Sequence, residues 1–201
     1  MAIVKALLSL CAVSSVVFAI EAPIPGYDVE TLAWNVHLDP RDDPITLSGT
    51  IEEVTSKAKK LNPRWARDME KRKPIRNDGA RLQARDWAYR VDCVDGNRWK
   101  MAGSAQIKEG LDYLSKISAK PKIGPGPGKC SRVSCSYHAA IWWCNDKSTG
   151  LELDSFKEIV SSATSILDHC TYYGATFDLV GGQAFMPDHW NVIIREDKDH
   201  C

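Results

Sequence analysis

The sequence predicts an α+β fold, a small two-layer sandwich in which two helices cover a mainly antiparallel sheet. After residue 86, apolar residues recur with strand and helix spacing in the order strand, helix, strand, helix, strand, strand. Helices that follow strands, with an antiparallel pair at the end, are typical of this architecture. The cysteines of the folded part all lie after residue 90, which predicts a domain stapled by three disulfides and preceded by a mostly irregular propeptide.

The first residues carry the pattern of a secretory signal peptide. A short positively charged stretch ends at Lys5, and an uncharged apolar run follows from Ala6 to Ala19. This run is shorter than the roughly 20 apolar residues needed to span a bilayer. Val17 and Ala19 provide the small residues that a signal peptidase requires, so we expect cleavage after Ala19. We therefore assign residues 1–19 to a signal peptide and expect no stable membrane insertion.

Six cysteines remain once Cys11 leaves with the signal peptide. They are Cys93, Cys130, Cys135, Cys144, Cys170 and Cys201. An even number of cysteines in an exported chain predicts a disulfide framework, with 15 connectivities left open by the sequence. Zinc sites use two close pairs of ligands, and no second pair accompanies Cys130 and Cys135. We expect neither a metal nor another cofactor.

Residues 20–85 read as a basic, cysteine-free propeptide with one helix. Thr50 and Glu53 form a capping box, apolar residues follow at helical spacing, and Pro63 ends the helix. The apolar surface is too small for an independent domain. Lys71-Arg72 and the segment ending at Arg85 match the preferences of furin- and kexin-type proteases, and the choice between the two sites stays open.

The basic run that begins at Lys71 also fits a nuclear-localisation or nucleic-acid patch. A secreted chain meets the processing protease first, which favours cleavage. The cysteine-bearing part is slightly acidic after Arg85, so it has no positive field for nucleic acid, and we expect no nucleic-acid partner.

The elements of the domain at residues 86–201 follow from local signals. Residues 87–91 alternate as a strand, Ser104 begins a helix, and the glycines and prolines of residues 124–128 form a surface loop. Residues 133–144 read as a central strand buried on both faces. Ser155 and Glu158 cap a second helix, whose final Cys170 should pin it to the sheet. Residues 183–185 and 190–195 form a last hairpin, and a bridge from Cys201 should hold its end.

Catalytic motifs are weak in this chain. The set His138, His189, Glu109 and Arg195 contains the acid, base and phosphate-binding groups of a secreted ribonuclease, but its spacing does not demand that arrangement. The chain has no serine nucleophile elbow and no phosphate-binding loop. We therefore assign no catalytic residue and expect a non-enzymatic protein.

Aromatic residues of the central strand are binding candidates. Trp142 and Trp143 point to opposite faces of a regular strand, so one of them, beside Tyr137 or Tyr172, would be free to stack on a sugar or to anchor a protein partner. The alternative is that both tryptophans fill the core.

Several motifs resemble those of fungal small secreted cysteine-rich proteins, which include candidate effectors of ascomycetes. The motifs are residues 45–54, residues 124–128 before Cys130, residues 140–146 and residues 190–195. The order of helices and cysteines is more distantly similar to necrosis-inducing extracellular factors and to killer toxins of smut fungi. Cysteine spacing differs from both, so no residue role is carried over.

The resemblance implies a two-layer α/β sandwich that acts outside the fungal cell that makes it. It implies a secreted effector or toxin-like protein that binds a host or competitor protein, or a cell-surface component, rather than catalysing a reaction. The alternative is a small secreted hydrolase of the ribonuclease-toxin type.

Overall fold

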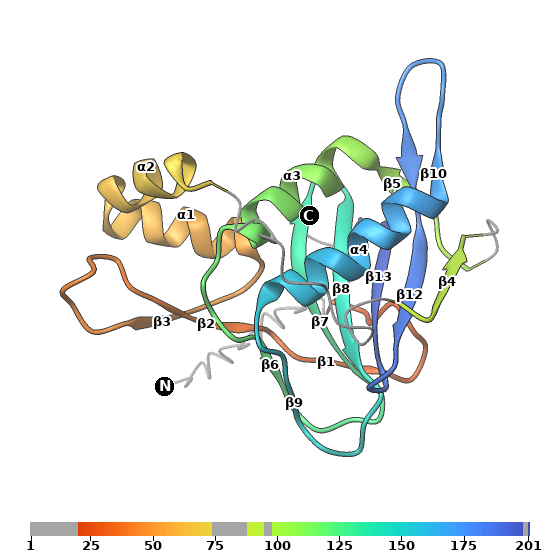
Figure 1. The fold of residues 1–201 in the computed structure, drawn as a ribbon, viewed down its shortest axis with the longest axis horizontal. Coiled ribbons are helices and arrows are strands. Elements are labelled where there is room, and N and C mark those ends of the chain that lie inside the picture. Colours follow the sequence, from red (N-terminus) through yellow and green to blue (C-terminus); the bar gives the residue numbers. More distant parts are fainter. Residues whose placement is uncertain (1–19, 74–87, 95–97, 199–200) are drawn as a thin grey trace, which may run out of the picture.

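The computed structural model describes residues 20–73, 88–94, 98–198 and 201. The predicted signal peptide with Ala19, and the predicted processing site at Arg85, lie outside the described residues. Figure 1 shows the fold as an α+β arrangement with helices packed on one face of a sheet, which confirms the predicted class. The described helices are α1 (Ile51–Leu61), α2 (Pro63–Lys71), α3 (Ser104–Ser115) and α4 (Phe156–Cys170).

The main sheet has six strands in the order β1-β7-β8-β13-β12-β4. All neighbours are antiparallel except β1 and β7, which run parallel. The strands are β1 (Asp28–Val29), β4 (Arg90–Cys93), β7 (Lys129–Ser136), β8 (Ala139–Asn145), β12 (Gly182–Met186) and β13 (Trp190–Glu196). The single central strand predicted over residues 133–144 is instead two paired strands, the end of β7 and most of β8, and the predicted burial on both faces is confirmed for every residue of β8.

Short strands form three accessory sheets around the main one. One sheet joins β10 (Thr171–Tyr172), β11 (Leu179–Val180) and β5 (Ala102–Gly103); the other two pair β2 (Ala33–Val36) with β3 (Ile45–Ser48), and β6 (Lys122–Ile123) with β9 (Leu151–Glu152).

Two apolar clusters lie on the two faces of the main sheet. Trp143, Val192 and Ile194 face α3 and α4 in the larger cluster, which also receives Trp190. The opposite face carries a smaller cluster around Trp142, covered by the arm of residues 20–27. Alternating side chains therefore bury β8 and β13 on both faces.

The disulfides connect Cys93 with Cys170, Cys130 with Cys144, and Cys135 with Cys201. The first joins β4 to the end of α4, which confirms that Cys170 pins this helix to the sheet. The third joins β7 to the last residue, as expected for a fixed chain end. The second crosses directly between paired positions of β7 and β8.

The front segment, which we define as residues 20–73, is ordered rather than mostly irregular. It contains the predicted helix α1 with its Thr50–Glu53 capping box, and also α2 and the β2–β3 hairpin. Asn62 ends α1 and caps α2, in which Pro63 occupies the first turn. The proline predicted to stop one helix therefore also starts the next.

This front segment packs into the main core. Trp34 stacks on Phe156 of α4 with ring centroids 4.5 Å apart, and Ile51 and Val54 of α1 are fully buried. The carboxylate of Glu52 accepts hydrogen bonds from Ser134 Oγ and, at 2.9 Å, from Cys135 N in β7. The segment thus supplies core residues to a fold whose cysteines all lie elsewhere.

Candidate functional site

The structure buries both tryptophans that were binding candidates. Trp142 and Trp143 are fully buried on opposite faces of β8, because both faces of this strand are covered. The core alternative is therefore the one the structure supports. Tyr137, the third candidate, lies in the turn between β7 and β8 and is 81% exposed. Of the three aromatics, it alone is available to a partner.

The ribonuclease candidates are not brought together. His138 and His189 lie in turns at opposite ends of the paired strands β8 and β13, which are in register from Ala139–Glu196 to Asn145–Trp190. Six residue steps along a strand separate such positions by ~20 Å. This distance is too large for one acid–base pair on a single phosphate.

The other two members of that set also face elsewhere. Glu109 is exposed on α3, on the helical side of the sheet. Arg195 lies on β13 and forms an ion pair with Asp197, at 3.4 Å, over the ring of Trp142 on the opposite side. The arrangement supports no catalytic role for these four residues.

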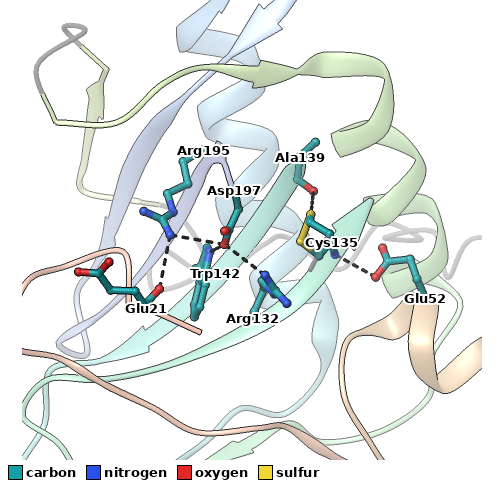
Figure 2. Close-up of polar contacts among 9 residues, drawn as sticks. Glu21, Glu52, Arg132, Cys135, Ala139, Trp142, Arg195 and Asp197 are labelled. Carbon is teal, nitrogen blue, oxygen red and sulfur yellow. Dashed lines mark hydrogen bonds and ion pairs between the residues drawn. A yellow bond between two sulfur atoms is a disulfide. The ribbon is translucent and has the colours of Figure 1, made fainter. Parts of the chain in front are cut away.

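A buried polar cluster occupies the second face of the sheet (Figure 2). Asp197 lies between the guanidinium groups of Arg132 and Arg195, each 3.4 Å from its carboxylate, and accepts a hydrogen bond of 3.1 Å from Trp142 Nε1. Its backbone N–H donates to His138 O at 2.8 Å. Arg195 also reaches the carbonyl oxygen of Glu21 at 3.5 Å.

This cluster holds together segments that are far apart in the sequence. It joins the tail after β13 to the β7–β8 turn, and through Glu21 it holds the arm of residues 20–27 against the sheet. The arm is also held by Trp99, whose Nε1 donates to Pro23 O at 2.7 Å. The side chain of Asp197 is only 2% exposed, so its contacts are internal and the cluster is a structural element.

Tyr27 anchors the same arm at the opposite end of β8. Its hydroxyl donates to Asp146 Oδ1 at 2.9 Å. Partial burial, followed by the hydrogen bond to the Asp146 carboxylate, raises the pKa of Tyr27 to about 12. The phenol is therefore held protonated well above the pH at which a free tyrosine ionises.

Exposed aromatic residues gather on one hairpin, formed by β10 and β11. Tyr172, Tyr173 and Phe177 are 64%, 78% and 65% exposed. Figure 1 shows this hairpin projecting beyond the end of α4 and the sheet. A side chain at Gly174 would meet the carbonyl oxygen of Phe177 at 2.5 Å, so glycine permits the tight turn.

The hairpin and the exposed Tyr137 lie at the same end of the sheet. β12 begins at Gly182 opposite Ile194, and the end of β13 lies opposite Ala139, the residue that follows the β7–β8 turn. We name Tyr172, Tyr173 and Phe177 the aromatic hairpin. Sequence reasoning considered Tyr172 only as a neighbour of an exposed tryptophan and missed the hairpin itself, because residues 171–180 show no strand alternation. The adjacent aromatic pair before a glycine was the available signal.

A cleft lies at the junction between the front segment and the cysteine-bearing part. Two neighbouring hollows of about 550 and 270 Å³ share Trp34, Asn35, His37, Ser118 and Ala119. One wall is β2, and the other is the chain between α3 and β6. We name these hollows together the β2 cleft. Sequence analysis did not anticipate it, since its walls are far apart along the chain.

The described residues contain no group of three or more side chains suited to hold a metal ion, and no helix among them is long and apolar enough to cross a membrane. Lys71 and Arg72, the first predicted processing site, are exposed at the end of α2, where Arg72 is already extended. No protein-family model, no curated protein and no solved structure matches this chain.

Proposed function

We propose that this chain is a secreted, cysteine-rich effector or toxin-like protein that acts outside the producing fungal cell by binding a protein of a host or competitor. The observation that carries the proposal is the aromatic hairpin, with three large aromatic side chains each more than 60% exposed. Aromatic residues dominate the energetics of protein interfaces, and exposing several of them together on one projection has no benefit for folding.

The disulfides support an extracellular setting. All six cysteines of the described residues are paired, and each bridge joins separate elements of the fold. Such bonds persist in oxidising compartments and are rare in the cytosol. Together with the signal-peptide pattern of residues 1–19, they support secretion.

The shape of the hairpin favours a protein partner. Small molecules bind in concave sites that surround them, whereas this hairpin is a projection. Asp178 is the only charged residue between Thr171 and Gly181, so the hairpin has no cation for phosphate groups of a membrane or a nucleic acid. A projection of tyrosine, phenylalanine, glycine and threonine resembles the composition of antibody paratopes, which bind protein surfaces.

The proposal is tested by binding of the labelled protein to intact plant cells and to cells of competing fungi. A variant with Tyr172→Ser, Tyr173→Ser and Phe177→Ser should bind at least ~100-fold more weakly, since one interfacial aromatic hot spot contributes ~2 kcal/mol, or about 30-fold. Tyr89→Ser is the matched control, because Tyr89 is 66% exposed beside β4 at the opposite end of the sheet.

Two further arms separate the alternatives. Protease treatment of the cells should abolish binding, whereas retention on purified chitin or glucan would assign the hairpin to a polysaccharide. Hydrolysis of RNA by the purified protein that disappears in His138→Ala or His189→Ala, with the fold intact, would establish the ribonuclease alternative instead.

A further inference from the structure

The free edge of β2 presents unpaired backbone groups to the β2 cleft. Gly49 N donates to Leu32 O at 3.0 Å, so Leu32 and Gly49 form a hydrogen-bonded pair of the β2–β3 ladder. Pairs of this kind alternate in an antiparallel ladder, so Trp34 and Val36 bond to β3. The N–H and C=O groups of Ala33 and Asn35 therefore point away from β3.

These groups open into the cleft. Ala33, Asn35 and His37 all line the larger hollow, and within the described part of the chain no backbone partner is found for Ala33 or Asn35 on this side. Exposed strand edges are normally blocked by charge, proline or a covering segment. Here the edge carries small or uncharged residues, and Ser118 and Ala119 form the facing wall.

The spacing of the free groups is that of a strand. Ala33 and Asn35 are two residues apart, so their equivalent backbone groups repeat at about 6.7 Å, which is the repeat of an extended peptide. A compact small molecule cannot match this repeat along an edge. A peptide in extended conformation would add as a third strand beside β2, with alternate side chains entering the cleft.

Charge sets the orientation of such a peptide. The smaller hollow is lined by Arg72 and His37 and by no acidic residue, and Arg72 has no ion pair among the described residues. In the larger hollow, at the other end of the cleft, the charges of Lys122 and Glu152 offset each other, because their side chains form an ion pair of 2.7 Å. The Arg72 end therefore attracts a carboxylate.

We propose that the β2 cleft binds an extended peptide segment of another protein by strand addition to the free edge of β2, with a carboxylate of that peptide at Arg72. This site is separate from the aromatic hairpin. Trp34 of the cleft stacks on Phe156, the first residue of α4, whereas the aromatic hairpin follows Cys170, the last residue of that helix. The length of α4, ~20 Å, therefore separates the cleft from the hairpin.

The test uses linear octapeptides displayed on phage and selected against the immobilised chain. An enriched peptide is synthesised with single N-methyl groups along its length. Strand addition predicts an alternating pattern, in which methylation of every second amide lowers affinity at least ~10-fold and methylation of the intervening amides does not. A flat pattern, or the absence of any enriched peptide, would overturn the proposal.

One matched pair of variants at Asn35 and one variant at Arg72 locate the site. Asn35→Pro removes the backbone N–H that points into the cleft without removing a bond to β3, and should abolish binding of the selected peptide. Asn35→Ala keeps that N–H, so the selected peptide should still bind to this variant. Arg72→Gln should weaken the acidic peptide about 10-fold, but not its amide analogue.

The effect of peptide methylation is measured with the unaltered protein. It therefore tests strand addition even if Asn35→Pro disturbs folding. The triple serine variant of the aromatic hairpin should retain full peptide binding. If it loses the peptide, the two surfaces are one site and the separate cleft is refuted. If the unaltered protein does not bind cells but still binds the selected peptide, the proposed function is refuted and the peptide site is not.

Discussion

Replacing Trp34 with alanine tests whether the front segment is part of the cooperative core. Trp34 is 2% exposed, its ring stacks on Phe156 with an interplanar angle of 5°, and its Nε1 donates to Gly49 O at 2.8 Å. A detachable propeptide would contribute little to the stability of the cysteine-bearing part. An integral segment makes this substitution one of the most damaging available in the chain.

The cost can be worked from these contacts. Truncating a buried aromatic side chain to alanine destabilises a protein by ~3–5 kcal/mol, and the Gly49 carbonyl that loses its donor adds ~1 kcal/mol. The sum of about 4–6 kcal/mol is a large part of the ~5–15 kcal/mol that holds a typical protein folded. For a chain of this length we expect the thermal midpoint to fall by ~8–24 °C.

The assay is thermal and urea unfolding of the purified, disulfide-bonded protein, followed by circular dichroism and tryptophan fluorescence. Trp34→Phe keeps the stacked ring, loses the N–H donor and should cost ~1–2 kcal/mol. Leu61→Ala is the control, since Leu61 is 59% exposed on α1 and should change stability by less than ~0.5 kcal/mol. A midpoint for Trp34→Ala within ~2 °C of the parent would refute the reasoning.

Three further predictions concern the chain ends and the processing site. Cys201→Ser breaks a bridge that spans 66 residues of sequence and contributes ~4 kcal/mol to stability. This variant should be secreted in sharply lower yield, whereas His200→Ala should not. Normal secretion of Cys201→Ser with unchanged thermal stability would contradict this prediction. Ionisation of Tyr27 is suppressed in the folded state, because its pKa is raised to about 12, so its stabilising bond to Asp146 is complete below pH ~10 and lost between ~10 and 12. The stability advantage over Tyr27→Phe should therefore shrink across that range, and an advantage independent of pH would exclude the bond as its source. Cleavage after Arg72 should give two chains that separate on a non-reducing denaturing gel yet co-elute in native size exclusion, because contacts rather than a disulfide hold the front segment; release of the front chain under native conditions would show these contacts to be too weak.

The secondary structure that could be predicted was the part encoded locally. The capping boxes at Thr50 and Ser155 fixed the starts of α1 and α4, and both boxes are present in the structure. The alternation of Trp190, Val192 and Ile194 identified β13 and its inward face. The even cysteine count gave three bridges but could not give the partners, because pairing depends on which elements meet in three dimensions.

The failures occurred where the local signal was absent or where distant segments meet. Tyr137 and His138 were assigned to the central strand, yet they form the two-residue turn before β8 with φ values of 46° and 64°. Turns of this kind usually carry asparagine or glycine, so nothing in the residue types announced it. The cleft and the role of Glu52 arise from contacts across more than 80 residues of sequence, which periodicity cannot reveal.

The placement of the bridges also decides how the molecule would respond to mechanical tension. A pull on the two ends would first extend the front segment, since no covalent cross-link interrupts it. Beyond Cys93 the load would pass through the bridge to Cys170 and then along residues 171–201, bypassing α3, β7, β8 and α4. The protein thus has an extensible stretch on each side of a cross-linked middle, and only a reducing agent would allow its full length to be drawn out.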